Sequence, residues 1–184
     1  MSKTAKTAIG GMMAALSVVL LVPTVLDVFV YVLPAFAGVI TMFCVIEMGK
    51  TWAFGVYAAT AIITMLVIPN KEAAVLYTAF FGYYPIVKAI FESKLPKVLG
   101  YVLKFAVFNA AVAVSYILLV KVFGMPFNEL MGIDGDAWWA RFAIPVMLVM
   151  GNLVFILFDF MLTRLVTVYL AVWQKKFHKM FRFK

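Results

Sequence analysis

The sequence predicts an all-α integral membrane protein, a bundle of six transmembrane helices that makes up a single domain over residues 1–184. Hydrophobic residues account for 66% of the chain and charged residues for only 13%, which is more apolar than a soluble domain of this size needs to be. The apolar residues form long runs, which excludes an outer-membrane barrel with its short alternating segments. The helices are expected at about residues 7–31, 35–48, 51–68, 72–92, 98–123 and 138–173.

The charges between these runs predict how the bundle is oriented. With six spans, one side of the membrane receives Lys3, Lys6, Lys50, Lys94, Lys97 and the basic tail 174–184. The other side receives Asp27, Lys71, Glu72, Glu129, Asp134 and Asp136. The positive-inside rule then predicts a multi-pass protein of the plasma membrane with both termini in the cytoplasm. The net charge of +8 is attributed to this orientation and to contact with anionic lipid, not to nucleic-acid binding.

The first helix begins with small residues. Gly10 and Ala14 are four residues apart, as are Gly11 and Ala15. Small residues at this spacing let another helix approach closely. Two interpretations remain open, namely ordinary packing inside the bundle and a docking face for a separate subunit.

The fourth helix is expected to be kinked and to lie inside the bundle. Pro85 lacks an amide hydrogen and crowds the carbonyl four residues back, so the helix should bend there, with Gly82 removing bulk beside the bend. Tyr77, Tyr84 and Lys88 share one face of this helix. A kinked helix with a polar stripe belongs among other helices and not against lipid.

Neutral polar side chains gather between the middle of the membrane and its outer surface. Because they are interleaved with aromatic residues, they suit an uncharged or zwitterionic, partly flat small molecule. Two interpretations remain open: the residues line one outward-opening cavity, or each simply forms hydrogen bonds between helices. The group consists of Tyr31, Tyr57, Thr60, Thr64, Tyr77, Asn109, Tyr116 and Asn152.

Charged side chains lie in the part of each helix that is expected to be nearest the cytoplasm. Lys88 and Glu92 are four residues apart and can pair on one helix. Asp159 can form an ion pair with Lys88 or Lys104 across the bundle. A neutralised clamp between helices, a proton or ion relay and a partner-docking patch all remain open. The group consists of Glu47, Lys88, Glu92, Lys104, Asp159 and Arg164.

Enzyme chemistry is not expected from this sequence. The only histidine, His178, lies in the basic tail and has no serine or cysteine nucleophile beside it. No acidic pair has metal-ligand spacing and no glycine-rich loop offers phosphate-binding amides. We therefore expect no metal and no cofactor, and any uphill transport must draw on an ion gradient or on another subunit.

Taken together, these features resemble the substrate-binding (S) components of energy-coupling factor transporters, which take up vitamins and other micronutrients. The resemblance is architectural and covers nearly the whole chain. Those proteins dock through an Ala-x-x-x-Ala face on the first helix, for which Gly11-x-x-x-Ala15 and Gly10-x-x-x-Ala14 are the nearest matches here. Their ligand site would fall near Asp27, Tyr31, Tyr77, Tyr84, Asn109, Tyr116 and Asn152.

The resemblance implies a small-molecule substrate, a transmembrane coupling subunit and two cytoplasmic ATPases that drive the cycle. It does not imply which micronutrient is bound. Two other functions remain open: a non-transporting membrane scaffold, such as the six-helix subunits of cell-shape machinery, and a small carrier coupled to protons or sodium. The carrier would need Asp159 or Glu47 to be reachable from both sides of the membrane.

Overall fold

The computed structural model describes residues 2–27, 29–125 and 140–174, and the regular structure in these ranges is entirely helical. The elements are α1 (Lys3–Leu21), η1 (Val22–Leu26), α2 (Val32–Met48), α3 (Lys50–Val67), α4 (Lys71–Leu76), η2 (Tyr77–Phe81), α5 (Tyr84–Lys94), α6 (Lys97–Ile117), η3 (Leu118–Val122), α8 (Ala140–Val168) and η4 (Tyr169–Trp173).

The described chain has the helices of a multi-pass membrane protein. Five helical stretches are long and apolar enough to cross a membrane, and α2 is a shorter apolar helix. Parts of the sequence on which the predicted orientation depends lie outside the described residues. These parts are Glu129, Asp134, Asp136, the basic tail beyond Gln174 and the start of the sixth predicted helix at 138.

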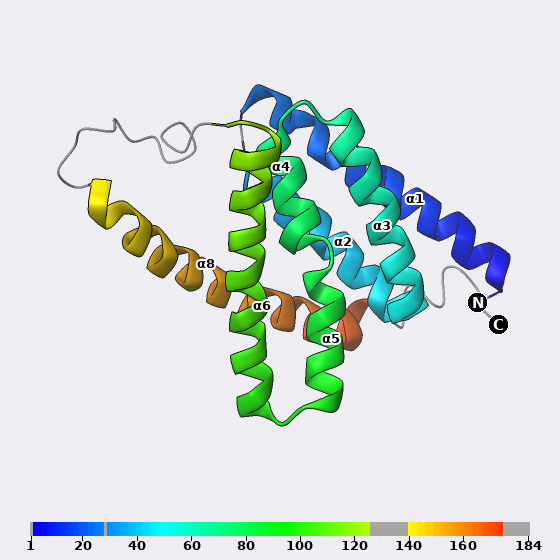
Figure 1. Ribbon diagram of the computed structural model, residues 1–184. Helices are drawn as coiled ribbons and strands as arrows, with labels where there is room; N and C mark the ends of the chain where they lie inside the picture. The colour runs from blue at the N-terminus through cyan, green and yellow to red at the C-terminus, as the bar shows by residue number, and fades with distance from the viewer. Residues whose placement is uncertain (1, 28, 126–139, 175–184) are drawn as a thin grey trace.

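The helices α1, α2 and α3 pack side by side (Figure 1). α1 ends at Leu21, earlier than the predicted end at 31, because Pro23 cannot donate a helical hydrogen bond. The short 3₁₀ helix η1 follows, and Asp27 and Phe29 then adopt left-handed backbone angles, with φ of 54° and 59°. These two residues turn the chain, so that α2 starts before the predicted position at 35.

Two lysines tie together the elements at one end of the bundle, which we call the N-terminal end. The Lys6 ammonium donates to the carbonyl of Met48, where α2 finishes, at 3.1 Å. The Lys50 ammonium donates to the Ser93 hydroxyl at 2.8 Å. The start of α1, the α2–α3 turn and the end of α5 therefore lie together.

The turns at the opposite end of the bundle are linked by two side-chain hydrogen bonds. The Asn70 amide donates to the Asp27 carboxylate at 2.8 Å, and the Tyr31 hydroxyl donates to the Glu72 carboxylate at 2.6 Å. Burial and the Glu72 carboxylate both raise the pKa of the Tyr31 phenol, which keeps it protonated as a donor. These bonds join the connection before α2 to the α3–α4 turn.

The predicted break in the fourth transmembrane segment is present, but it begins before Pro85. The segment changes from α4 to the π-helix η2, in which the Gly82 amide donates to the Tyr77 carbonyl five residues back, at 2.8 Å. α5 restarts at Tyr84 and holds Pro85 in its first turn, where a missing amide hydrogen costs nothing. The proline therefore starts the second half of the segment.

Two glycines let the π-helix pack closely against its neighbours. A Cβ atom on Gly38 of α2 would lie 2.5 Å from the Phe81 carbonyl oxygen. A Cβ atom on Gly82 would lie 2.6 Å from the Tyr57 ring and 2.9 Å from that of Tyr77. Real Cβ contacts are not this short, so η2 sits where it does because both side chains are hydrogen atoms.

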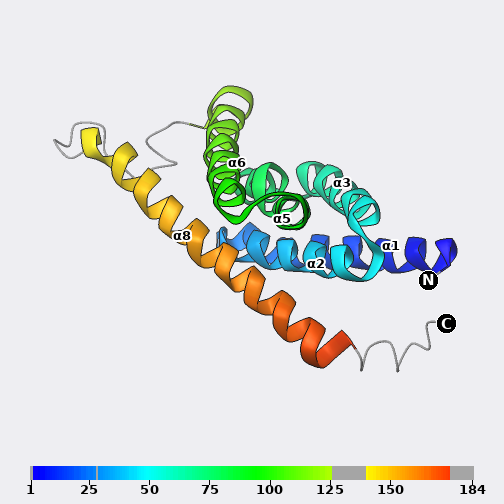
Figure 2. The ribbon, with the colours of Figure 1, turned by 90° about the horizontal axis from the view of Figure 1, so that it is seen from below.

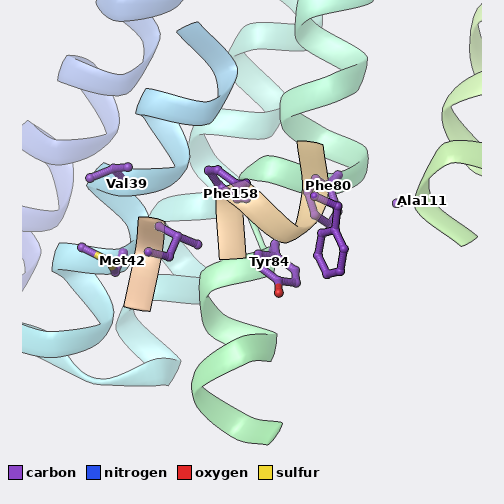
Figure 3. Packing of buried hydrophobic residues seen from close by; sticks show 8 residues of the cluster. Val39, Met42, Phe80, Tyr84, Ala111 and Phe158 are labelled. Carbon is purple, nitrogen blue, oxygen red and sulfur yellow. The ribbon is translucent and has the colours of Figure 1, made fainter. Parts of the chain in front are cut away.

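α8 crosses α6 obliquely and completes the core (Figures 1 and 2). Phe80 of η2 lies at the centre of this core and contacts the rings of Tyr84, Phe108, Phe155 and Phe158. Figure 3 shows Phe80, Tyr84 and Phe158 gathered together, with the Tyr84 hydroxyl at the edge of the group. The buried residues of the cluster are Val39, Met42, Phe80, Tyr84, Ala111, Phe155, Phe158 and Leu162.

Candidate functional site

Four charged side chains from three helices form one ion-pair network, which we call the charge cluster: Lys88 and Glu92 of α5, Lys104 of α6 and Asp159 of α8. The Lys88 ammonium lies 2.7 Å from Glu92 and 2.6 Å from Asp159. The Lys104 ammonium lies 2.6 Å from Glu92 and 3.2 Å from Asp159. Each cation therefore contacts both anions, and the cluster holds α5, α6 and α8 together.

Two hydroxyl groups complete the hydrogen bonds of the charge cluster. The Tyr84 hydroxyl donates to the Asp159 carboxylate at 2.6 Å. The Lys88 ammonium donates to the Thr163 hydroxyl at 2.8 Å, and that hydroxyl donates to the Asp159 backbone carbonyl at 2.9 Å. Tyr84, which the family resemblance assigned to ligand binding, thus has its hydroxyl among the charges.

Burial explains why the charges are so fully paired. A charge in an apolar interior or a membrane is expensive unless an opposite charge and hydrogen bonds compensate it. The side chains of Lys88 and Lys104 are only 5% and 4% exposed, and that of Asp159 is 10% exposed. Two positive and two negative groups make the cluster neutral, as the sequence interpretation of a clamp requires.

The other two members of the predicted inner group lie elsewhere. Glu47 accepts a hydrogen bond from the Tyr169 hydroxyl of η4 at 2.9 Å. The Arg164 guanidinium lies over the ring of Phe160, 4.9 Å from its centroid. Glu47 and Tyr169 form part of the wall of an apolar cavity of about 250 Å³ between α1, α2 and η4. Four of the six predicted residues therefore form the charge cluster, and Glu47 and Arg164 each lie at a separate place.

A second polar group lies where α2, α3 and η2 meet, and we call it the hydroxyl cluster: Thr41, Tyr57, Thr60, Tyr77 and Thr78. Thr41, Thr60 and Tyr77 are fully buried. The Tyr57 hydroxyl donates to the Thr78 backbone carbonyl at 2.7 Å, and the hydroxyls of Thr41 and Tyr77 lie 3.5 Å apart. The rings of Tyr57 and Tyr77 have centroids 6.2 Å apart. Three predicted ligand residues are therefore brought together.

Two hydroxyls of the hydroxyl cluster have no hydrogen-bond partner. They are the buried side-chain oxygens of Thr60 and Thr78. The Thr60 hydroxyl lies close to the Tyr77 hydroxyl, but the contact is too long or too bent to meet the geometric criteria of a hydrogen bond, so at most a weak hydrogen bond joins them. A buried hydroxyl without a partner costs about 1–3 kcal/mol, so each such group in a folded protein requires an explanation.

A groove of about 310 Å³ runs along α3 beside the hydroxyl cluster. Thr78 of η2 forms one wall, and Ala61, the residue after Thr60, forms part of the other. The remaining lining side chains are apolar: Ile62, Met65 and Leu66. The surface of the groove is thus apolar, and the unpaired hydroxyl of Thr78 is buried beneath it.

The remaining residues of the predicted outer group are not part of the hydroxyl cluster. Tyr31 binds Glu72 at the opposite end of the bundle from the N-terminus. Asn109 and Asn152 form a reciprocal amide pair between α6 and α8, with N–O distances of 3.1 and 3.3 Å. Tyr116 is partly exposed on α6. Thr64 is buried near the hydroxyl cluster, but it donates to the Ala61 carbonyl of its own helix, at 3.1 Å.

The small residues of α1 divide between two faces. Gly10 and Ala14 are buried, and a Cβ atom on Gly10 would lie 3.3 Å from Val56 of α3. Gly11 and Ala15 are exposed, and no atom lies within 4 Å of a Cβ built on Gly11. The first pair packs α1 against the bundle. The second pair leaves a strip of small residues on the exposed face of α1.

Sequence reasoning missed several members of these sites. Thr163 is four residues after Asp159 and so shares its helical face, a spacing that could have identified it. Thr41 is a lone hydroxyl in an apolar helix, which is a weaker signal. Thr78 lies in the π-helix η2 and Tyr169 in the π-helix η4, and a shift in helical hydrogen bonding leaves no periodic pattern in the sequence.

Within the described residues, no group of three His, Cys, Asp or Glu side chains is arranged to hold a metal ion. The two candidate sites are therefore a neutral ion-pair network and an incompletely hydrogen-bonded hydroxyl cluster beside a groove. No protein-family model, curated protein or solved structure matches this chain.

Proposed function

We propose that this chain is the substrate-binding subunit of an uptake system for a small organic micronutrient, similar to the S components of energy-coupling factor transporters. The observation that carries the proposal is the pair of buried hydroxyls, Thr60 and Thr78, which have no hydrogen-bond partner and lie beneath the groove that Thr78 and Ala61 help to line. A ligand that enters the groove and displaces the side chains covering these hydroxyls would form hydrogen bonds with them and so compensate the cost of leaving them unpaired.

The surroundings of the groove indicate what kind of ligand would fit. Its volume is at the lower end of the range for small-molecule pockets, about 300–1,000 Å³. The ring of Tyr57, a member of the hydroxyl cluster, contacts the ring of Tyr83, with centroids 5.9 Å apart. Aromatic rings, apolar walls and neutral hydroxyls favour an uncharged or zwitterionic, partly flat molecule.

The outer strip of α1 supports the second half of the proposal, a separate coupling subunit with cytoplasmic ATPases. Gly11 and Ala15 face away from the bundle, and small residues at this spacing permit close helix packing in a membrane. With both termini in the cytoplasm, as the positive-inside rule predicts, the ATPases would act on the side that carries the N-terminal end of the bundle.

Thr60→Val tests the ligand site, because valine has the shape of threonine but cannot form a hydrogen bond. Native mass spectrometry of the protein purified from membranes should detect a retained small molecule, and Thr60→Val and Thr78→Val should lose it. Thr64→Val is the matched control, since the Thr64 hydroxyl already bonds its own helix. Equal retention by all three variants would place the ligand elsewhere, and no retained molecule in any sample would contradict a binding function.

Gly11→Leu tests the docking face. The added side chain should prevent co-purification of a coupling subunit and ATPases without affecting ligand retention. Gly55→Leu is the matched control, because Gly55 of α3 is likewise exposed with no atom within 4 Å of a built Cβ. Unchanged complex formation by Gly11→Leu would show that α1 does not dock the partner.

A membrane scaffold is the second candidate, and a separate observation favours it. Several predicted ligand residues bond one another or neighbouring side chains, as in the Asn109–Asn152 and Tyr31–Glu72 pairs. Such hydrogen-bonded pairs typically hold neighbouring helices together, and they leave fewer polar side chains free to bind a ligand. Protein partners that co-purify without any retained small molecule would support the scaffold.

A further inference from the structure

The charge cluster is unevenly buried, and Glu92 is its one accessible member. The side chain of Glu92 is 48% exposed, whereas those of Lys88, Lys104 and Asp159 are exposed by 10% or less. Glu92 lies near the end of α5, which reaches the N-terminal end of the bundle. Solvent or a dissolved molecule can therefore reach the cluster from the side that Glu92 covers.

The two carboxylates are held very differently. Asp159 receives hydrogen bonds from Tyr84 and both lysines, and it uses both of its oxygens. Glu92 uses a single oxygen, Oε1, which bridges Lys88 at 2.7 Å and Lys104 at 2.6 Å. Apart from the two lysines, no hydrogen-bond donor to Glu92 is found in the described part of the chain. Asp159 is therefore buried in the core, whereas Glu92 contacts the two lysines from the exposed side of the cluster.

Without Glu92, the cluster would be a site for an anion. Two lysines and one aspartate leave a net charge of +1, with two buried ammonium groups aimed at one point. An incoming oxyanion would keep the cluster neutral, because it replaces one negative group by another. No helix needs to move, because the half-exposed Glu92 side chain can rotate away from the lysines while the backbone of α5 stays in place.

We propose that Lys88 and Lys104 form a binding site for the oxyanion of a small molecule, a carboxylate or a phosphate, and that Glu92 occupies this site when no ligand is bound. The inference is independent of the groove beside the hydroxyl cluster, which lies between α3 and η2 and takes a neutral ligand. Glu92 acts as an internal competitor, so it lowers the apparent affinity for external anions.

Glu92→Gln removes the competitor's charge while keeping its shape. The full chain in neutral detergent is titrated with inorganic phosphate at constant ionic strength, and the thermal unfolding midpoint is recorded. The variant should show a saturable rise in this midpoint, with an apparent phosphate affinity about tenfold above wild type if Glu92 fills the site nine-tenths of the time. Glu72→Gln, the same change at the opposite end of the bundle, should behave as wild type.

The double variant Glu92→Gln/Lys104→Met provides the decisive control. It leaves Lys88 paired with Asp159 and restores neutrality, so the saturable response should disappear. The proposal is overturned if Glu92→Gln responds no more than wild type to both dissolved phosphate and an anionic lipid, or if the double variant still responds. Should Glu92→Gln fail to fold, Glu92→Asp keeps the charge but reaches less far, and its phosphate affinity must also exceed that of wild type.

Lipid headgroups carry the same chemistry as dissolved phosphate, and a parallel measurement separates the two sources. Glu92→Gln is reconstituted in bilayer discs of phosphatidylcholine alone and of phosphatidylcholine with phosphatidylglycerol. Stabilisation by dissolved phosphate in both discs assigns the site to a soluble molecule. Stabilisation by phosphatidylglycerol without any effect of dissolved phosphate assigns the oxyanion to a lipid.

Discussion

The charge cluster and the hydroxyl cluster are both polar groups buried in an apolar bundle, but their hydrogen bonding differs. Every charged group in the first contacts two opposite charges, and hydroxyls from Tyr84 and Thr163 complete its bonds. In the second, the hydroxyls of Thr60 and Thr78 have no partner. Both lie along the same transmembrane segment, since α5 continues from η2 after a short break.

The difference follows from what each group costs when unpaired. A buried charge without a partner destabilises a protein by several kcal/mol, whereas an unpaired hydroxyl costs only about 1–3 kcal/mol. A fold can therefore keep a few open hydroxyls for a ligand, but it cannot leave a buried lysine open. This is why the charge cluster contains its own counter-anion and the hydroxyl cluster does not.

Asp159→Asn should produce the largest effect, because it leaves two buried lysines with one carboxylate. We expect the free energy of unfolding to fall by about 3–5 kcal/mol, measured by dodecyl sulfate titration in mixed micelles. Adding Lys104→Met restores neutrality and should recover much of the loss. An equal loss from Asp27→Asn, which removes an exposed carboxylate at the opposite end of the bundle, would mean that burial of the cluster is not the cause.

Gly82→Ala should come next, since it disturbs the frame of the hydroxyl cluster without changing a polar group. The new methyl group would meet the Tyr57 and Tyr77 rings at less than 3 Å, and such overpacking costs about 1–3 kcal/mol. Gly55→Ala is the control: it has open space around it and should be neutral or stabilising by up to about 1 kcal/mol. A similar response from both variants would argue against the close packing of η2.

Thr60→Val should act in the opposite direction on the protein without ligand. Removing an unpartnered buried hydroxyl should stabilise the fold by about 1 kcal/mol. Thr64→Val removes a hydroxyl that is hydrogen bonded to Ala61 and should show no such gain. Thermal unfolding midpoints of the two variants, measured side by side, show whether Thr60→Val is stabilised and Thr64→Val is not. A loss of stability in Thr60→Val would show that its hydroxyl has a partner.

Asn152→Leu should have the smallest effect. Its amide pair with Asn109 is complete, but hydrogen bonds between membrane helices contribute only about 0.6 kcal/mol on average. The coupling energy from a double-mutant cycle with Asn109→Leu isolates that value. A coupling energy near zero would show that the pair does not fasten α8 to α6.

Local spacing in the sequence predicted part of this structure. The separation of four residues predicted the Lys88–Glu92 pair, and buried charge required a partner such as Asp159. The resemblance gave no sign that Tyr84 would bond Asp159, because that contact depends on the π-helix before it. The meeting of Asn109 with Asn152 likewise depends on how α8 crosses α6, which helical periodicity does not encode.

The π-helix η2 also sets the rotation of everything that follows it in the segment. Its hydrogen bonds span five residues where those of an α-helix span four, so removing a single residue such as Ala79 would turn α5 by about 100° around its axis. Tyr84 and Lys88 would then face away from α8 and lose Asp159. The π-helix that supplies Tyr77 and Thr78 to the hydroxyl cluster thus also aligns Tyr84 and Lys88 with Asp159, so one local change in hydrogen bonding positions both clusters.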